Sequence, residues 1–127
     1  MWKPVALVFF GGAAGAILRE LFMVLTPKLT DNFPLDILVA NLLACVLLGV
    51  VTGLYRRRAV SEGTNVLLGT GVAGGLSTFS SFAYGTVVLM SGSAASAGVA
   101  AAYVLTSLFL GYVAVLCGER LAARSRP

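Results

Sequence analysis

The feature that most restricts the fold of this chain is a run of 56 residues, between Glu62 and Glu119, without a Lys, Arg, Asp or Glu. A helix needs about 20 residues to cross a bilayer, so this run is too long for one crossing and suits two. The tripeptide Ser91-Gly92-Ser93 is the natural place for a turn between them. Only 11% of the residues are charged, against about 25% in soluble domains. The sequence therefore predicts an all-α membrane protein.

The other apolar segments provide two further crossings, which makes four. The expected spans are residues 4–25, 37–55, 63–90 and 94–118, within a single transmembrane domain that comprises residues 1–127. Three consecutive arginines, residues 56–58, end the second span, and Pro27 and Pro34 in the connection before it favour turns. The multi-pass chain has the lipid bilayer as its surroundings.

Pairs of small residues four positions apart recur in three of these spans. Such pairs let helix backbones approach closely in lipid, where no hydrophobic drive brings helices together. We therefore expect tight helix packing at Gly11/Gly15, Gly49/Gly53 and Gly71/Gly75. A bundle of four helices is too thin to enclose a wide polar path, so a transport function favours dimerisation.

Basic residues are distributed unevenly between the two sides of the membrane. Four crossings place both termini and the arginines at 56–58 on one side, and Lys28 alone stands on the other. The positive-inside rule then places both termini in the cytoplasm. The apolar pattern continues past the small residues at 13–16, so we expect a retained first helix there and not a signal peptide. Seven basic residues share the cytoplasmic side: Lys3, Arg56, Arg57, Arg58, Arg120, Arg124 and Arg126.

The sequence lacks the residues that several classes of function require. The chain has no histidine, and Cys45 and Cys117 each stand alone in an apolar stretch, so zinc sites and disulfide frameworks are not expected. Both thiols are interpreted as buried and inert. No acid/base pair is available within the bundle, so the chain is not expected to be an enzyme. The basic residues flank spans and form no patch, which argues against a nucleic-acid partner.

Polar residues at membrane depth are the informative ones, because an unpaired polar group there costs several kcal/mol. Each also has an ordinary structural role: Ser and Thr can bond the carbonyl one turn back, Asn41 can join two helices, and Arg19 can reach toward the headgroups. The polar residues at this depth are Arg19, Asn41, Ser77, Thr78, Ser80, Ser81, Tyr103, Thr106 and Ser107.

The third span carries the densest polar cluster. Gly74-Gly75 weakens a helix directly before four hydroxyl residues in five positions, so we expect a break between Gly74 and Ser77. Carbonyls freed by such a break would form a cation site. Phe79 and Phe82 lie on one helix face, and their electropositive ring edges favour an anion in the ring plane. With the Asn41 amide and the hydroxyls as donors, this combination suits a small, tightly hydrated anion.

Three segments together resemble the signature of the Fluc (CrcB-type) fluoride channels. They are GGAAGAILR at residues 11–19, Asn41 in the second span, and GVAGGLSTFSSF at residues 71–82, and the resemblance covers all four spans in order. It implies a dimer of antiparallel subunits with two fluoride pores and a central structural sodium ion. Such a dimer exports fluoride passively across a bacterial-type plasma (inner) membrane and so relieves fluoride toxicity.

The resemblance also assigns residues. Gly74 and Ser77 match positions whose main-chain carbonyls hold the sodium ion. The matching pore residues are Asn41, Phe79, Phe82, Ser80, Ser81, Tyr103, Ser107 and Arg19. Two positions depart from the family pattern: Gly85 replaces the usual glutamate, and Gly111 cannot continue a hydroxyl track after Ser107.

The charge count leaves the dimer type open. A chain that inserts in both orientations should show little bias, so seven basic residues against one are compatible with one half of a heterodimer, although a homodimer is favoured. Two other functions stay open as well. One is a small proton-coupled exporter of cationic drugs, which needs a deep carboxylate that Glu20 does not provide beside Arg19 near a helix end. The other is a non-transporting assembly subunit.

Overall fold

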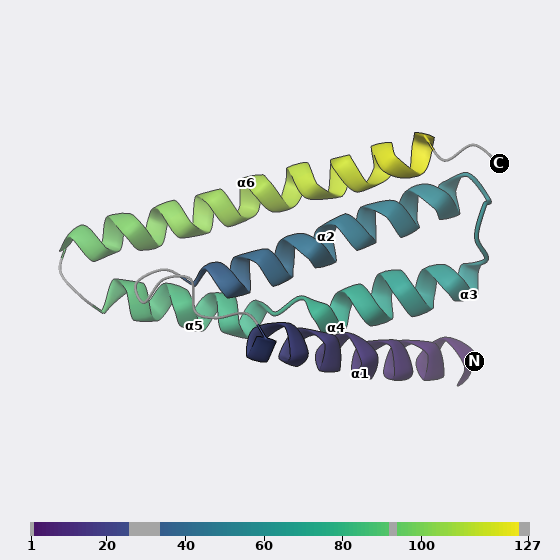
Figure 1. The fold of residues 1–127 in the computed structure, drawn as a ribbon, viewed down its shortest axis with the longest axis horizontal. Coiled ribbons are helices and arrows are strands. Elements are labelled where there is room, and N and C mark those ends of the chain that lie inside the picture. The colour runs from purple at the N-terminus through teal and green to yellow at the C-terminus, as the bar shows by residue number, and fades with distance from the viewer. Residues whose placement is uncertain (1, 26–33, 92–93, 125–127) are drawn as a thin grey trace.

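The computed structural model of the chain describes residues 2–25, 34–91 and 94–124, and among these it contains helices and no strand. Within this part of the chain, four helices are long and apolar enough to cross a membrane. The third crossing is divided into four pieces, and the other three are continuous (Figure 1). The elements are α1 (Trp2–Leu25), α2 (Leu35–Arg56), α3 (Glu62–Asn65), the π-helix η1 (Val66–Ala73), α4 (Gly74–Leu76), α5 (Phe79–Met90) and α6 (Ala94–Arg124).

The helices reach slightly further than the spans predicted from charge. The largest difference is at the end of α6, which continues from residue 118 to Arg124. Charged residues limit how far a helix is buried in lipid, but they do not end the helix itself. Ala122 in this extension is buried, and its carbonyl accepts a hydrogen bond from the Arg57 side chain. The predicted turn at Gly92-Ser93 and the connection at residues 26–33 lie outside the described residues.

Two helix pairs make up the bundle. α2 packs along α6, and α1 packs along η1 and α4, while α5 lies against α6 (Figure 1). Many large apolar side chains point away from these contacts, such as Phe9 at 68% and Phe109 at 67% exposure. A chain with this surface needs an apolar medium around it, and it is a multi-pass membrane protein.

Glycines form both helix seams. A β-carbon on Gly15 would overlap the Val72 carbonyl oxygen, and one on Gly75 would overlap the Gly12 carbonyl oxygen. On the other seam, a β-carbon on Gly49 would overlap the Val115 carbonyl oxygen. The predicted small-residue pairs therefore mark the places where two backbones touch, which confirms the tight packing expected for them.

The start of α1, the end of α6 and the connection between α2 and α3 lie at the same end of the bundle (Figure 1). At this end Arg56 forms an ion pair with Glu119 at 3.1 Å, which joins α2 to α6. This arrangement agrees with an even number of crossings. Cys117 on α6 is exposed and Cys45 is half-buried, so the prediction that both thiols are buried is wrong for Cys117. The neighbouring Gly118 is the residue that faces α2.

Candidate functional site

The third crossing breaks after Leu76, at two residues with extended backbone. Ser77 has φ −74° and ψ 154°, and Thr78 has φ −143° and ψ 109°. The helix runs through Gly74, whose φ of −63° and ψ of −39° are helical. The break predicted between Gly74 and Ser77 therefore lies at the end of that segment. Glycine weakens a helix, but the break begins two residues after Gly75, directly before the Thr78 cap of the helix that starts at Phe79.

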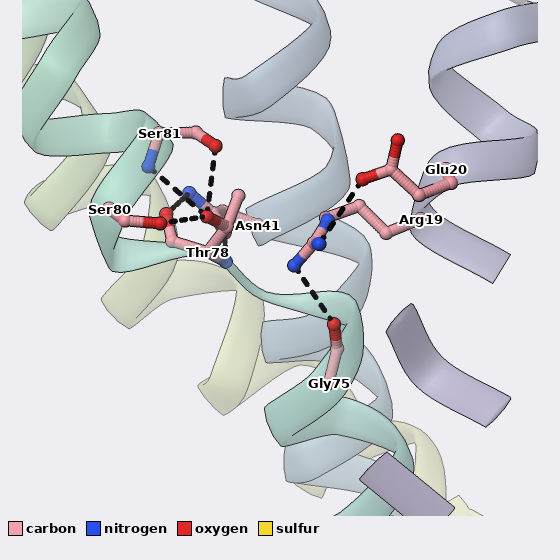
Figure 2. A network of polar contacts seen from close by, with 7 residues as sticks. All are labelled: Arg19, Glu20, Asn41, Gly75, Thr78, Ser80 and Ser81. Carbon is pink, nitrogen blue, oxygen red and sulfur yellow. Dashed lines mark hydrogen bonds and ion pairs between the residues drawn. The ribbon is translucent and has the colours of Figure 1, made fainter. Parts of the chain in front are cut away.

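Thr78 caps the new helix α5. Its Oγ1 accepts a hydrogen bond from the Ser81 amide at 3.2 Å and donates to the Ser81 Oγ at 3.0 Å, and it lies 3.2 Å from the Ser80 Oγ. Threonine is a preferred N-cap residue, and this one is buried at 6% exposure. The hydroxyls of Ser80 and Ser81 thus gather around Thr78 (Figure 2). The assigned pore residues did not include Thr78, although a Thr three positions before Ser81 was a readable cap signal.

Asn41 on α2 binds both backbone groups of Thr78. The Thr78 amide donates to Oδ1 at 2.7 Å, and Nδ2 donates to the Thr78 carbonyl at 3.4 Å (Figure 2). This is the helix-joining role that the sequence left open for Asn41. An amide nitrogen carries two protons, so its second proton is still available to an ion and the pore assignment stays a prediction.

Arg19 reaches the other side of the break. Its Nη1 donates to the Gly75 carbonyl at 3.3 Å, and its Nη2 pairs with Glu20 at 3.2 Å (Figure 2). The side chain is 22% exposed, because it points toward the end of α4. Its guanidinium satisfies a carbonyl that a helix end leaves without an intrahelical donor.

Three consecutive carbonyl oxygens before the break, at the end of η1 and in α4, each accept a hydrogen bond from a different donor. The Ala73 oxygen accepts from the Ser77 amide at 3.0 Å, the Gly74 oxygen accepts from the Ser77 hydroxyl at 3.2 Å, and the Gly75 oxygen accepts from Arg19. The Thr78 amide, which would bond the Gly74 oxygen in a continuous helix, donates to Asn41 instead. Gly74 is exposed, with open space where a side chain would be.

Three aromatic rings form a row from the surface to the core. Phe79 lies 6.0 Å from Phe82, and Phe82 lies 5.4 Å from Tyr103, measured between ring centroids. Phe79 is 80% exposed, whereas Tyr103 is fully buried. The rings are tilted by 40° and 33° and do not stack face to face. Phe82 therefore packs against α6, while Phe79 projects from the subunit.

A groove of about 270 Å³ runs between α2, the break, α5 and α6. Five of the assigned residues line it, namely Asn41, Ser77, Phe79, Phe82 and Ser107. The other lining residues are Leu38, Leu42, Cys45, Thr78, Leu108 and Gly111. Tyr103, Ser80, Ser81, Arg19 and Gly74 are not part of the lining, and their assigned roles stay predictions.

Helix α6 contributes the hydroxyl of Ser107 and the glycine at position 111 to this groove. Ser107 donates to the Tyr103 carbonyl one turn back, at 2.7 Å, which is the usual local bond of a serine in a membrane helix. Gly111 lines the groove without a side chain. Gly85 is buried on α5, and a β-carbon there would lie 3.2 Å from the Cγ of Pro34. A glutamate at position 85 would have to press against this proline.

Comparison with known proteins agrees with the resemblance. Residues 6–119 match the family model described as CrcB-like protein, Camphor Resistance (CrcB). A fluoride-specific ion channel FluC of Brucella melitensis is 55% identical over 125 residues, which are 98% of this chain and 46% of that protein. A FluC of Yersinia pseudotuberculosis is 41% identical over 97% of this chain and 91% of its own length. A FluC of Ignicoccus hospitalis is 38% identical over 96% and 97%.

The chain therefore spans less than half the length of the Brucella relative but nearly all of the Yersinia and Ignicoccus relatives. The family match leaves only a few residues at each end unmatched. With this coverage and identity, the chain belongs to the CrcB-like family.

Proposed function

We propose that the chain is a fluoride-selective passive ion channel that exports fluoride from the cytoplasm and relieves its toxicity. The observation that carries the proposal is the groove, which brings Asn41, Ser107 and the two phenylalanines of α5 together beside a broken helix. Relatives that are 55% and 41% identical bear the name fluoride-specific ion channel. A channel of this kind catalyses no reaction, and its site needs no acid/base pair.

The groove offers what a small anion loses when it leaves water. The second proton of the Asn41 Nδ2 is one donor, and the edges of Phe79 and Phe82 supply positive electrostatic potential without a strong, slow-releasing bond. Leu38, Leu42 and Leu108 add apolar walls, which disfavour water beside the ion. Weak interactions at several points let an ion enter and also leave, as conduction requires.

A second subunit completes the pore in this proposal. The exposed Phe79 and the open side of the groove need a cover that excludes lipid, and an antiparallel copy of the chain provides it. The dimer then has two grooves and two pores in a bacterial-type plasma (inner) membrane. A homodimer is the favoured form, and a paired heterodimer is the alternative.

The central sodium ion belongs to the same proposal. The carbonyl oxygens of Gly74 and Ser77 stand at the helix end, and Gly74 faces open space on the subunit surface. Uncharged carbonyl oxygens are hard ligands that suit sodium, and two subunits would supply four of them. The residues present therefore fit the ion, which would hold the two broken helices together.

Fluoride efflux from liposomes that contain the purified protein tests the function. Fluoride should leave once a potassium shunt removes the opposing voltage, and chloride should stay. Equal chloride efflux would show that the channel is not selective. Fluoride or drug movement that requires a proton gradient would support the exporter instead, and no movement of either would support a non-transporting subunit.

A further inference from the structure

The groove continues beyond Asn41 along α2. Leu38, Asn41, Leu42 and Cys45 all line it, and their spacing of three, four and seven positions places them on one face of the helix. Cys45 therefore lies one turn from Asn41, about 6 Å further along the helix axis. The proposed function, taken from the family pattern, gives this residue no role.

Gly111 stands opposite Cys45 on α6. A β-carbon on Gly111 would lie 3.6 Å from the Cys45 Sγ, which is an ordinary contact distance. The absence of a side chain at this position leaves space directly beside the thiol. Both residues line the same groove as Asn41 and Ser107, so the space is continuous with the site already described.

The hydroxyl groups that line the groove already donate hydrogen bonds within the protein. Ser107 donates to the Tyr103 carbonyl at 2.7 Å, and Ser77 donates to the Gly74 carbonyl at 3.2 Å. Thr78 donates to the Ser81 Oγ at 3.0 Å. Each hydroxyl has one proton, so an anion must compete with these bonds. Among the described residues, the Cys45 thiol has no hydrogen-bond partner, so its proton is available without breaking a bond.

We infer that the Cys45 thiol, in the space left by Gly111, is a further hydrogen-bond donor to the permeating fluoride ion, one helix turn beyond Asn41. This inference rests on the proposed channel function. A thiol is a weak donor, so it stabilises a passing anion without holding it. Cys45 and Gly111 together thus take the position where the family pattern would continue its hydroxyl track on α6.

The first test asks whether fluoride flux depends on a hydrogen-bond donor at position 45. The variants Cys45→Ser and Cys45→Ala are assayed by fluoride efflux from liposomes, with Cys117→Ala as the matched control. Cys45→Ser should give a flux between those of the original protein and Cys45→Ala, because its hydroxyl is a stronger donor of similar size but also bonds the carbonyl one turn back, as Ser107 does. Cys45→Ala should lose about tenfold, as expected for one hydrogen bond to a charged group. Cys117→Ala should leave the flux unchanged, because Cys117 does not line the groove.

A small thiol reagent provides a second test on folded protein. Methyl methanethiosulfonate converts the thiol to a methyl disulfide and releases methanesulfinate, so the donor proton is lost and the space beside Gly111 is filled. The reagent should abolish fluoride flux in the Cys117→Ala protein and have no effect when Cys45 is also Ala.

The outcomes separate this inference from the proposed function. Normal flux in Cys45→Ala, or continued flux after complete conversion of Cys45 to the methyl disulfide, would overturn the inference while the channel function stands. Absence of fluoride flux in the unmodified protein would overturn both. If Cys45→Ala does not fold, the reagent result on the Cys117→Ala protein decides the matter.

Discussion

Asn41 gives the Thr78 amide the partner that the Gly74 carbonyl would provide in a continuous helix. Its amide accepts from one backbone group of Thr78 and donates to the other, at 2.7 and 3.4 Å. The same side chain lines the groove. One residue thus joins α2 to the break and also offers its second amide proton to the candidate ion path.

Asn41→Ala should affect both stability and transport. It leaves the amide of the buried Thr78 without a partner, which costs about 1–3 kcal/mol of unfolding free energy, while the Thr78 carbonyl keeps its bond from the Phe82 amide. Thermal unfolding in detergent should therefore occur at a lower temperature. Fluoride flux should fall by at least tenfold, which corresponds to about 1.4 kcal/mol in the free-energy barrier to fluoride passage. Asn65→Ala, on α3 outside the groove, is the control and should change neither. Unchanged stability of Asn41→Ala would contradict the role of the amide at the break.

Phe79 and Phe82 differ in their surroundings, which allows chemistry and packing to be separated. Replacement of Phe79 by Ile should reduce fluoride flux sharply without destabilising the subunit fold, because the ring is 80% exposed. Phe82→Ile should reduce flux and also cost about 1 kcal/mol, because the ring packs against Tyr103. Flux in liposomes and thermal unfolding in detergent are the two measurements.

Phe109→Ile is the matched control for these two variants, because Phe109 is exposed on α6 and does not line the groove. It should keep full flux. Full flux in both Phe79→Ile and Phe82→Ile would return these residues to an ordinary packing role.

At the scale of the element, the third crossing spans the membrane once, but its backbone hydrogen bonds divide it into two helical parts, one before and one after the break. α4 ends with carbonyls held by Ser77 and Arg19, and α5 begins with a threonine cap. Upstream, the π-helix η1 packs on α1 through Gly71, whose β-carbon would lie 2.9 Å from the Gly11 Cα. π-helical turns are frequent at functional sites, and only the short helix α4 separates this one from the break.

Sodium binding at the break should survive Ser77→Ala. The proposed ligands are main-chain oxygens, and this variant removes only the hydroxyl that bonds the Gly74 carbonyl. The freed carbonyl is then more available to a cation. Sodium content of the purified dimer, measured by atomic spectroscopy after dialysis into potassium or N-methylglucamine buffer, should match that of the original protein. Loss of the ion in Ser77→Ala would show that the hydroxyl itself is a ligand.

At the scale of the whole molecule, the charge distribution and the proposed antiparallel assembly favour opposite outcomes. The described basic residues outside the spans lie at the end of the bundle that carries the start of α1, the α2–α3 connection and the end of α6 (Figure 1). Such a bias favours one orientation in the membrane, whereas an antiparallel homodimer requires both.

A cysteine at position 125 distinguishes the two assemblies. In a Cys45→Ala, Cys117→Ala background, Ser125→Cys is labelled in intact cells with a membrane-impermeant thiol reagent. Labelling of about half the protein is expected for the dual-topology homodimer. Complete protection would contradict it. Fluoride flux from the unmodified chain that appears only on co-expression with an oppositely biased subunit would identify a heterodimer.

Local patterns in the sequence determined the helices and much of the site. The charge-free runs determined four crossings, because a charged group in lipid is costly wherever the helix is placed. The glycine pairs marked the seams, since no other residue lets two backbones touch. The spacing of Phe79 and Phe82 placed both rings on one face, and both line the groove.

Partners distant in the sequence were decided only by the tertiary structure. Asn41 bonds a residue 37 positions away, and Arg19 bonds a carbonyl 56 positions away. Cys45 on α2 lies next to Gly111 on α6. Such pairs depend on the rotation of each helix about its axis and on the depth at which helices pack. Those quantities are settled by the contacts of all the helices together, so a single segment determines its own helix but not the partner of each side chain.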